Sequence, residues 1–262
     1  MRAFRRIVAM LALVGCGALA ALWLTGLVDS MLYYPQMASR AEPRGLIRIA
    51  LPDGGTIAAV YRPNPKARHT IWFFHGNAEA LGDLDPFFDE LHARGFAVFA
   101  YDYPDYGLSL GKPSEKGINQ ASTVAAAYLR DTLGVPLESV ILCGRSLGGG
   151  PAVEVATQEK VAGLVLQSTF MSVFRVVTQR KLLPFDQFEN LEKLPRVSCP
   201  VLVMHGTADE VIAFAHGKAL FTAAKEPKAH LWIEGARHND FTAIAGERYW
   251  RALQEFSASL PK

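Results

Sequence analysis

The chain has 262 residues, half of them hydrophobic and a fifth charged, which is enough apolar material for one large core in a single domain of ordinary size. The formal net charge is +2, but three arginines precede the first acidic residue, and the remainder carries 24 basic residues against 25 acidic ones. This balance excludes a strongly basic nucleic-acid-binding protein, and three widely spaced cysteines form neither a disulfide framework nor a metal cluster.

The first predicted element is a membrane anchor. Residues 7–28 form a run of 22 without a charge. As a helix this run is about 33 Å long, and the core of a bilayer is roughly 30 Å thick. Arginines lie before the run and no basic residue follows until Arg40, so the positive-inside rule predicts a cytoplasmic amino terminus. We expect residues 1–30 to be an uncleaved anchor in a bacterial cytoplasmic membrane, with residues 31–262 as one domain facing the periplasm.

Two other interpretations of this segment stay open. Ala18-Leu19-Ala20 could be a signal-peptidase site, and Leu13-Val14-Gly15-Cys16 looks like a bacterial lipobox. In both cases the apolar run continues well past the point of cleavage, whereas a cleaved signal has an apolar region of only about 7 to 15 residues. A secreted or lipid-anchored protein is therefore the alternative to the uncleaved anchor.

Hydrophobic patterning predicts alternating strands and helices after the anchor. Residues 46–51 and 56–61 are expected to form a hairpin around Pro52-Asp53-Gly54-Gly55. Further strands are predicted at 70–74, 97–101, 140–143, 162–166, 201–204 and 230–233, with helices near 85–94, 118–133, after 148, and at 213–224 and 242–256. Such alternation implies an α/β fold with a mostly parallel eight-stranded sheet flanked by helices.

An apolar insertion interrupts this alternation before the seventh strand. It covers about residues 169–196 and contains Phe170, Met171 and Phe174 near its start. It sits where a short helical cap over a site could lie, and these three residues are the predicted substrate-binding side chains. Ordinary packing of a surface helix is the alternative.

Chemically useful residues follow several of the predicted strands, at the sheet edge where open α/β sheets bind ligands. Gly144-Arg145-Ser146-Leu147-Gly148 follows the strand at 140–143 and is typical of a nucleophile elbow, where small residues make room for a sharp turn from strand to helix. Asp209 and His238 follow the seventh and eighth strands, and Asn77 follows the third.

These residues are of the types that activate a serine as a nucleophile. A serine hydroxyl needs a base, a task that suits His238, and the base needs an acid that fixes its tautomer, a task that suits Asp209. The backbone amides of Asn77 and Leu147 are expected to form the oxyanion hole. No metal or cofactor is required. Among the neighbouring acids, Glu210 adjoins Asp209, and Asp240 is expected to cap the last helix.

Three further residues have predicted or open roles. His75 and His205 are expected to hydrogen-bond the turns at the ends of their strands. Arg145 either meets an anionic group of the substrate or pairs with a carboxylate in a neighbouring loop.

Several segments between residues 46 and 256 match one known family. They are His75-Gly76-Asn77-Ala78-Glu79, Tyr101-Asp102-Tyr103, Tyr106-Gly107, Gly111-Lys112-Pro113-Ser114-Glu115, Gly144-Arg145-Ser146-Leu147-Gly148, His205-Gly206-Thr207-Ala208-Asp209 and Gly235-Ala236-Arg237-His238-Asn239-Asp240. With them the chain resembles the α/β-hydrolase superfamily, and more narrowly the membrane-anchored acyl hydrolases that include protein depalmitoylases and lysophospholipid or monoacylglycerol lipases. One departure is Pro104-Asp105, where such relatives often have Arg-Gly or Pro-Gly.

The resemblance and the residues together predict a serine hydrolase that cleaves lipid-like carboxylic esters or thioesters through an acyl-enzyme. A serine peptidase on the same fold and a non-catalytic binding protein are the alternatives. The predicted partners are a small acyl ester and the membrane, without nucleic acid.

Overall fold

The computed structural model describes residues 27–181 and 186–261. The chain divides into two compact units, Met1–Tyr34 and Pro35–Lys262. In the first unit the described part begins with helix α2, Leu27–Leu32. The predicted anchor lies almost wholly outside the described residues and stays a prediction. Among the residues that are described, none of the helices has the length and hydropathy that a membrane span needs.

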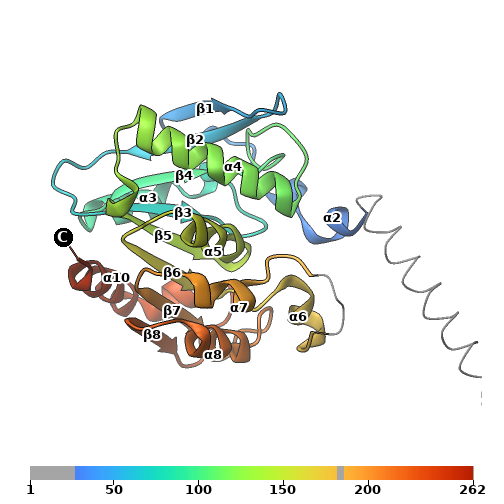
Figure 1. Cartoon of the computed structure of the whole chain (residues 1–262), viewed down its shortest axis with the longest axis vertical. Coiled ribbons are helices and arrows are strands. Elements are labelled where there is room, and N and C mark those ends of the chain that lie inside the picture. The colour runs from blue at the N-terminus through green and yellow to red at the C-terminus, as the bar shows by residue number, and fades with distance from the viewer. Residues whose placement is uncertain (1–26, 182–185, 262) are drawn as a thin grey trace, which may run out of the picture. The chain divides into compact units, whose positions relative to one another are not determined.

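The second unit is built on one eight-stranded sheet (Figure 1). Its strands are β1 Leu46–Ala50, β2 Thr56–Arg62, β3 Thr70–Phe74, β4 Ala97–Tyr101, β5 Val140–Arg145, β6 Gly163–Gln167, β7 Val201–Gly206 and β8 Lys228–Ile233. They lie in the order β1-β2-β4-β3-β5-β6-β7-β8. β1 and β2 form an antiparallel hairpin, β2 runs antiparallel to β4, and all remaining pairs are parallel. The predicted mostly parallel sheet is confirmed.

Helices lie on both sides of this sheet (Figure 1). The helices of the second unit are α3 Asp85–Ala93, α4 Glu115–Ala127, α5 Gly149–Gln158, α6 Val173–Thr178, α7 Asn190–Lys193, α8 Phe214–Ala223, α9 Phe241–Ala245 and α10 Glu247–Ser259. One core cluster joins α3, α9 and α10 to alternate residues of the strands, Ile71 and Phe73 of β3 among them. The residues between them belong to the other face, where Trp72 stacks on Phe74 with ring centroids 4.8 Å apart. Because both faces are covered, the central strands are apolar throughout rather than alternating.

Two helices differ from their predicted extents. The helix predicted at 118–133 begins earlier, because Ser114 caps it by accepting a hydrogen bond from the amide of Gly117 at 3.0 Å. It then continues as a π turn over Tyr128–Thr132. The helix predicted at 242–256 is divided into α9 and α10 by Gly246, whose φ of +54° no helix can contain.

The insertion between β6 and β7 contains α6 and α7 and is held on the body of the domain. Phe188, in the segment between these helices, is fully buried, and its ring lies so close to Gly150 of α5 that a Cβ there would come within 2.4 Å of it. The amide of Phe188 also donates to Glu115 Oε1 at 3.0 Å. The described part of the insertion is therefore packed on α4 and α5.

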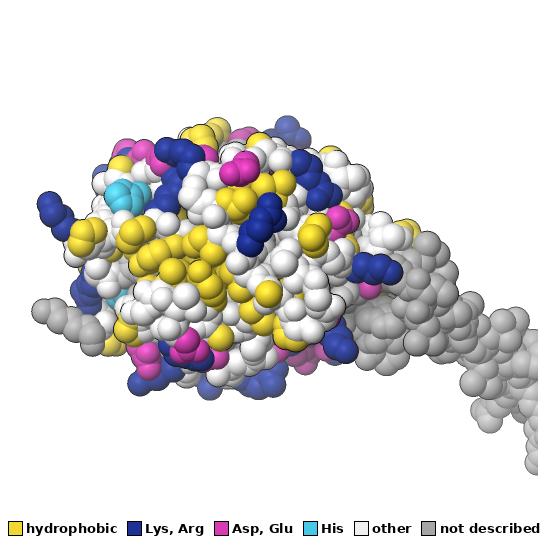
Figure 2. All heavy atoms as spheres, turned by 90° about the horizontal axis from the view of Figure 1, so that it is seen from above, with side chains coloured by type: hydrophobic (Ala, Val, Ile, Leu, Met, Phe, Trp, Pro, Cys, Tyr) yellow, Lys and Arg dark blue, Asp and Glu magenta, His cyan; other side chains and the backbone are white. Residues whose placement is uncertain are grey.

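The face of the molecule that lies uppermost in Figure 1 carries hydrophobic side chains at its centre (Figure 2). Basic side chains of lysine and arginine and acidic side chains of aspartate and glutamate both lie around this apolar area. Charges of one sign do not gather into a stripe on this face, in keeping with the near balance of basic and acidic residues in the sequence.

Candidate active site

Ser146 stands at a tight turn between β5 and α5. Its φ is +52°, in the left-handed region that residues other than glycine rarely adopt. The turn brings backbone segments close together, and a Cβ on Gly144 would lie 2.5 Å from the carbonyl oxygen of Gly148. A Cβ on Gly148 would lie 2.1 Å from the carbonyl oxygen of Phe74. Both positions therefore require glycine, as the predicted nucleophile elbow demands.

The structure brings Ser146, His238 and Asp209 into one hydrogen-bonded chain. His238 Nε2 lies 3.0 Å from Ser146 Oγ, and His238 Nδ1 lies 2.8 Å from Asp209 Oδ2. The serine and the histidine are 92 residues apart in sequence. Each follows the carboxyl end of a different strand, and the parallel strands place those ends at one edge of the sheet.

Asp209 is held as an ionised, oriented carboxylate. Its Oδ1 accepts hydrogen bonds from the amides of Val211 at 3.0 Å and Ile212 at 2.7 Å. Burial works to raise the pKa of Asp209, but the side chains of His205 and His238 and the amide of Ile212 outweigh burial and hold that pKa well below its usual range. The ionised carboxylate can thus accept a hydrogen bond from Nδ1 of His238 at neutral pH.

The two neighbouring acids have other partners. Glu210 Oε2 accepts from the amide of His238 at 3.3 Å, and Asp240 Oδ1 accepts from the amide of Arg237 at 2.7 Å. Asp240 directly precedes α9 but makes no side-chain capping bond to it. The expectation that Asp240 caps the last helix is wrong, because its carboxylate instead closes the turn that carries His238.

The two predicted oxyanion residues lie on the segments that flank the serine. Leu147 follows Ser146 in the 3-10 turn Ser146–Gly148. Asn77 belongs to the loop after β3, which passes so near the serine that a Cβ on Gly76 would lie 3.7 Å from Ser146 Cβ. The Asn77 side chain is fixed by Tyr106, whose hydroxyl donates to Asn77 Oδ1 at 2.5 Å.

Behind this loop lies a buried polar group that includes His75 and Asp102. His75 Nδ1 lies 2.8 Å from the carbonyl of Gly76, as predicted, and Tyr103 donates its hydroxyl to the carbonyl of His75 at 2.8 Å. Burial lowers the pKa of His75 to about 4 and raises the pKa of Asp102 to about 7. Asp102 Oδ1 also accepts from the amide of Leu81 at 2.9 Å.

The sequence interpretation assigned no role to Asp102, Tyr103 or Tyr106. Their position in the sequence could have indicated a role, because all three follow β4 and so lie at the edge of the sheet where Ser146 lies. His205 behaves as predicted, because its Nε2 lies 2.8 Å from the carbonyl of Ile212 in the turn after β7.

Arg145 has a carboxylate partner in a neighbouring loop, which is one of its two predicted roles. Its guanidinium lies against Glu79, with Nε 3.1 Å from Oε2 and a terminal nitrogen 2.5 Å from Oε1. The same group lies 5.0 Å from the ring centroid of Phe73 and 5.5 Å from that of Phe87. Arg145 is thus engaged by protein groups on several sides.

Asp105 explains how the loop after β4 tolerates the departure from the family pattern. Its φ is +68°, the conformation that a glycine adopts at no steric cost. Aspartate enters this region more readily than most residues. Arg40 supports the loop by donating to the carbonyl of Gly107 at 2.8 Å and to Asp105 Oδ1 at 3.3 Å.

The insertion starts directly beside the serine. Thr169 donates its hydroxyl to the carbonyl of Ser146 at 2.7 Å, so the residues that follow Thr169 leave from the site. Phe170 is buried, whereas Met171 and Phe174 are half-buried. The predicted substrate-binding residues therefore occupy an apolar segment that begins beside Ser146.

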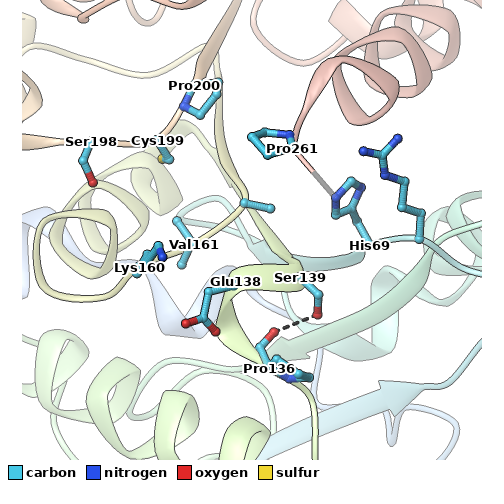
Figure 3. A pocket seen from close by; sticks show the side chains of 12 residues that line it. His69, Pro136, Glu138, Ser139, Lys160, Val161, Ser198, Cys199, Pro200 and Pro261 are labelled. Carbon is cyan, nitrogen blue, oxygen red and sulfur yellow. Dashed lines mark hydrogen bonds between the residues drawn. The ribbon is translucent and has the colours of Figure 1, made fainter.

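A hollow of about 750 Å³ lies elsewhere in the domain (Figure 3). Its lining residues include His69, Ser139, Ala162 and Pro200, each of which precedes a strand of the sheet. The hollow is therefore at the amino ends of the strands, opposite to Ser146. His69 also bonds Ser257 Oγ at 2.7 Å, so the rim is tied to α10.

The chain is similar in sequence to several α/β-hydrolase proteins. A family described as serine aminopeptidase, S33 matches residues 65–185. The alpha/beta hydrolase domain-containing protein aho-3 of Caenorhabditis elegans is 44% identical over 74% of this chain, and the chain spans 59% of that relative's length. The human alpha/beta hydrolase domain-containing protein 17B is 40% identical over 78% of this chain and 71% of its own length.

Solved structures show the same fold at lower identity. An esterase of Pyrococcus furiosus superposes with a TM-score of 0.70 at 16% identity and covers 82% of this chain and 91% of its own. The monoacylglycerol lipase of Paleococcus ferrophilus superposes with a TM-score of 0.63 at 23% identity and covers 78% of this chain and 98% of its own. With an eight-stranded sheet, a serine at a tight strand-to-helix turn and relatives at 40% identity and above, the chain belongs to the α/β-hydrolase superfamily.

Proposed function

We propose that the protein is a serine hydrolase that cleaves carboxylic esters or thioesters through an acyl-enzyme. The observation that carries this proposal is the chain of two hydrogen bonds from Ser146 Oγ to His238 and from His238 to Asp209. A serine hydroxyl alone is a weak nucleophile at neutral pH, and a histidine within hydrogen-bond reach is what activates it.

In this proposal each side chain has one task. His238 Nε2 removes the hydroxyl proton of Ser146 while Ser146 Oγ attacks the acyl carbon. His238 then gives that proton to the departing alcohol or thiol. Asp209 stabilises the imidazolium that exists between the two transfers. Water then attacks the acyl-enzyme with His238 again as the base, and this step releases the acid and restores the serine.

The oxyanion that forms at the acyl carbon needs preorganised donors. The backbone amides of Asn77 and Leu147 fit this task, because they belong to the two segments that meet at Ser146. Removal of one such donor from a serine hydrolase typically costs a factor of about 10² to 10³ in kcat.

The substrate class is an apolar acyl ester. The apolar segment that leaves Thr169, with Phe170, Met171 and Phe174, lies beside the nucleophile and suits an acyl chain better than a charged acid group. A membrane anchor over residues 1–30, with the domain outside a bacterial cytoplasmic membrane, would keep the site within reach of lipid-derived esters. This location is part of the proposal.

Labelling with a fluorophosphonate probe tests the nucleophile. The wild-type protein should be labelled on Ser146 and should hydrolyse activated esters, and Ser146→Ala should lose both, with hydrolysis reduced at least about a thousandfold. Circular dichroism and urea unfolding should show that Ser146→Ala remains folded. Equal turnover by the folded variant would contradict the assignment of Ser146.

A peptidase is the second candidate, because the matching family is described as a serine aminopeptidase. An ester and an amide of the same acyl group distinguish the two. We expect the ester to be cleaved much faster, because its leaving group departs more easily. A kcat/KM for aminoacyl amides equal to that for the matched esters would favour the peptidase.

A further inference from the structure

Glu79 and Arg145 join the two segments that carry the proposed oxyanion donors. Glu79 lies in the loop after β3, two residues beyond Asn77, and Arg145 is the residue before Ser146. They are 66 residues apart in sequence. The guanidinium meets both carboxylate oxygens, at 3.1 Å from Nε to Oε2 and 2.5 Å from a terminal nitrogen to Oε1. We call this ion pair the Glu79–Arg145 bridge.

Glu79 also holds the loop from within. Its Oε2 accepts a hydrogen bond from the amide of Gly76 at 2.6 Å, so one carboxylate oxygen serves both the loop and the arginine. The amide of Gly76 is therefore engaged by Glu79, and Asn77, the proposed donor, is the next residue along this segment.

The bridge is partly shielded from water. Arg145 has 17% of its side chain exposed and Glu79 has 32%. The rings of Phe73 and Phe87 lie against the guanidinium at 5.0 and 5.5 Å, so Arg145 has little freedom to leave the carboxylate. Bidentate pairs of this kind fix geometry as well as supplying energy.

We propose that the Glu79–Arg145 bridge is a positioning device that sets the spacing between the amides of Asn77 and Leu147, and so tunes the oxyanion hole. Neither residue touches the reacting atoms. The bridge clamps the loop after β3 to the elbow, through Glu79 two residues beyond Asn77 and through Arg145 directly before Ser146. This inference rests on the proposed function, because it needs an oxyanion to act upon.

Two variants separate positioning from general support. In Glu79→Gln the side-chain carbonyl can still accept from Gly76, but the charge on the carboxylate is lost. In Arg145→Met the contact with Phe73 and Phe87 is kept, but the charge on the guanidinium is lost. We expect each to lower kcat about tenfold or more with KM changed less than about threefold, since displaced donors weaken only the transition state. The double variant should lose little more than either single variant.

A matched control comes from a second bidentate pair. Arg94 meets Glu247 at 2.7 and 2.5 Å and lies 5.4 Å from the ring centroid of Trp250, but this pair involves neither the Asn77 loop nor the elbow. Glu247→Gln should therefore leave kcat within about twofold of wild type. Urea unfolding of all variants shows whether a loss of rate merely follows a loss of stability.

The decisive readout is the affinity for an alkyl boronic acid, which forms a tetrahedral adduct on serine. In Glu79→Gln and Arg145→Met its Ki should rise by the same factor by which kcat/KM falls. An unchanged kcat, or a fall in kcat with an unchanged Ki, would overturn the positioning role while wild-type labelling of Ser146 still supports the hydrolase. A wild-type protein that neither hydrolyses esters nor reacts with the fluorophosphonate would overturn both proposals.

Discussion

At the scale of single residues, the acids near His238 differ in the direction in which each carboxylate points. Asp209 presents Oδ2 to His238 while its other oxygen is fixed by two backbone amides. Glu210 and Asp240 lie close in sequence to the same pair, yet both accept hydrogen bonds from backbone amides instead. Orientation rather than proximity therefore selects the acid.

The first prediction concerns this selection. Asp209→Asn should lower kcat about 10³- to 10⁴-fold, because an amide donor facing Nδ1 favours the wrong tautomer of His238. Asp240→Asn and Glu210→Gln are the controls and should stay within about fivefold of wild type. Steady-state hydrolysis of a p-nitrophenyl ester measures all three. A severe loss in Asp240→Asn with a mild one in Asp209→Asn would reverse the assignment.

At the scale of elements, the insertion between β6 and β7 is the part of the domain that we propose to meet the acyl group of the substrate. Thr169 at its start bonds the carbonyl of Ser146, and Phe188, between α6 and α7, packs on α5. Between these two residues, α6 carries Phe174, which is half-buried, and Val177, which is 86% exposed. The inward side of α6 is therefore the part of the insertion suited to meet an acyl chain.

The second prediction concerns acyl length. Each buried methylene is worth about 0.8 kcal/mol, so kcat/KM for p-nitrophenyl esters should rise severalfold per two carbons, from acetyl to a medium or longer chain. Phe174→Ala should reduce this gain, whereas Val177→Ala on the exposed side should not. The esters must be kept below their aggregation limits. A steady fall from acetyl onward would contradict the acyl-binding role of the insertion.

At the scale of the whole molecule, buried histidines link stability to pH. His216 of α8 is 1% exposed; its Nδ1 accepts from the amide of Met171 at 3.1 Å, and its Nε2 has no hydrogen-bond partner among the described residues. Burial lowers the pKa of His216 to about 4 from its ordinary 6.5. Below pH 6.5 the unfolded chain therefore binds a proton at His216 that the folded protein does not bind. The free energy of unfolding consequently falls as the pH drops from 6.5 towards 4.

The third prediction measures this linkage. Between pH 7 and pH 5 the single group should cost about 2 kcal/mol of unfolding free energy. His216→Asn keeps an acceptor near the position of Nδ1 but cannot titrate, so its loss of stability over this range should be smaller by about that amount. Urea unfolding at the two pH values tests this, with His230→Asn on the exposed edge strand β8 as the control. Equal slopes for wild type and His216→Asn would contradict the linkage.

The amino-acid sequence by itself determined the sheet, the elbow and the identity of the three aligned side chains. Strands buried on both faces are continuous apolar runs, and the steric needs of a tight turn appear as glycines at fixed spacing, so both are local signals. The order of serine, acid and histidine along the chain completed the assignment. The anchor over residues 1–30 is also a sequence inference, and the described residues do not test it.

Only the tertiary structure decided the hydrogen-bond and ion-pair partners of the polar side chains. Arg145 pairs with a carboxylate 66 residues away, and Asp102, which follows β4, lies beside His75, which follows β3, in a buried polar group. Gly246 divides the last helix by its backbone conformation, and Asp240 turns to the His238 loop instead of capping that helix. These choices depend on long-range packing and on the direction of each polar atom, which residue type and spacing do not specify.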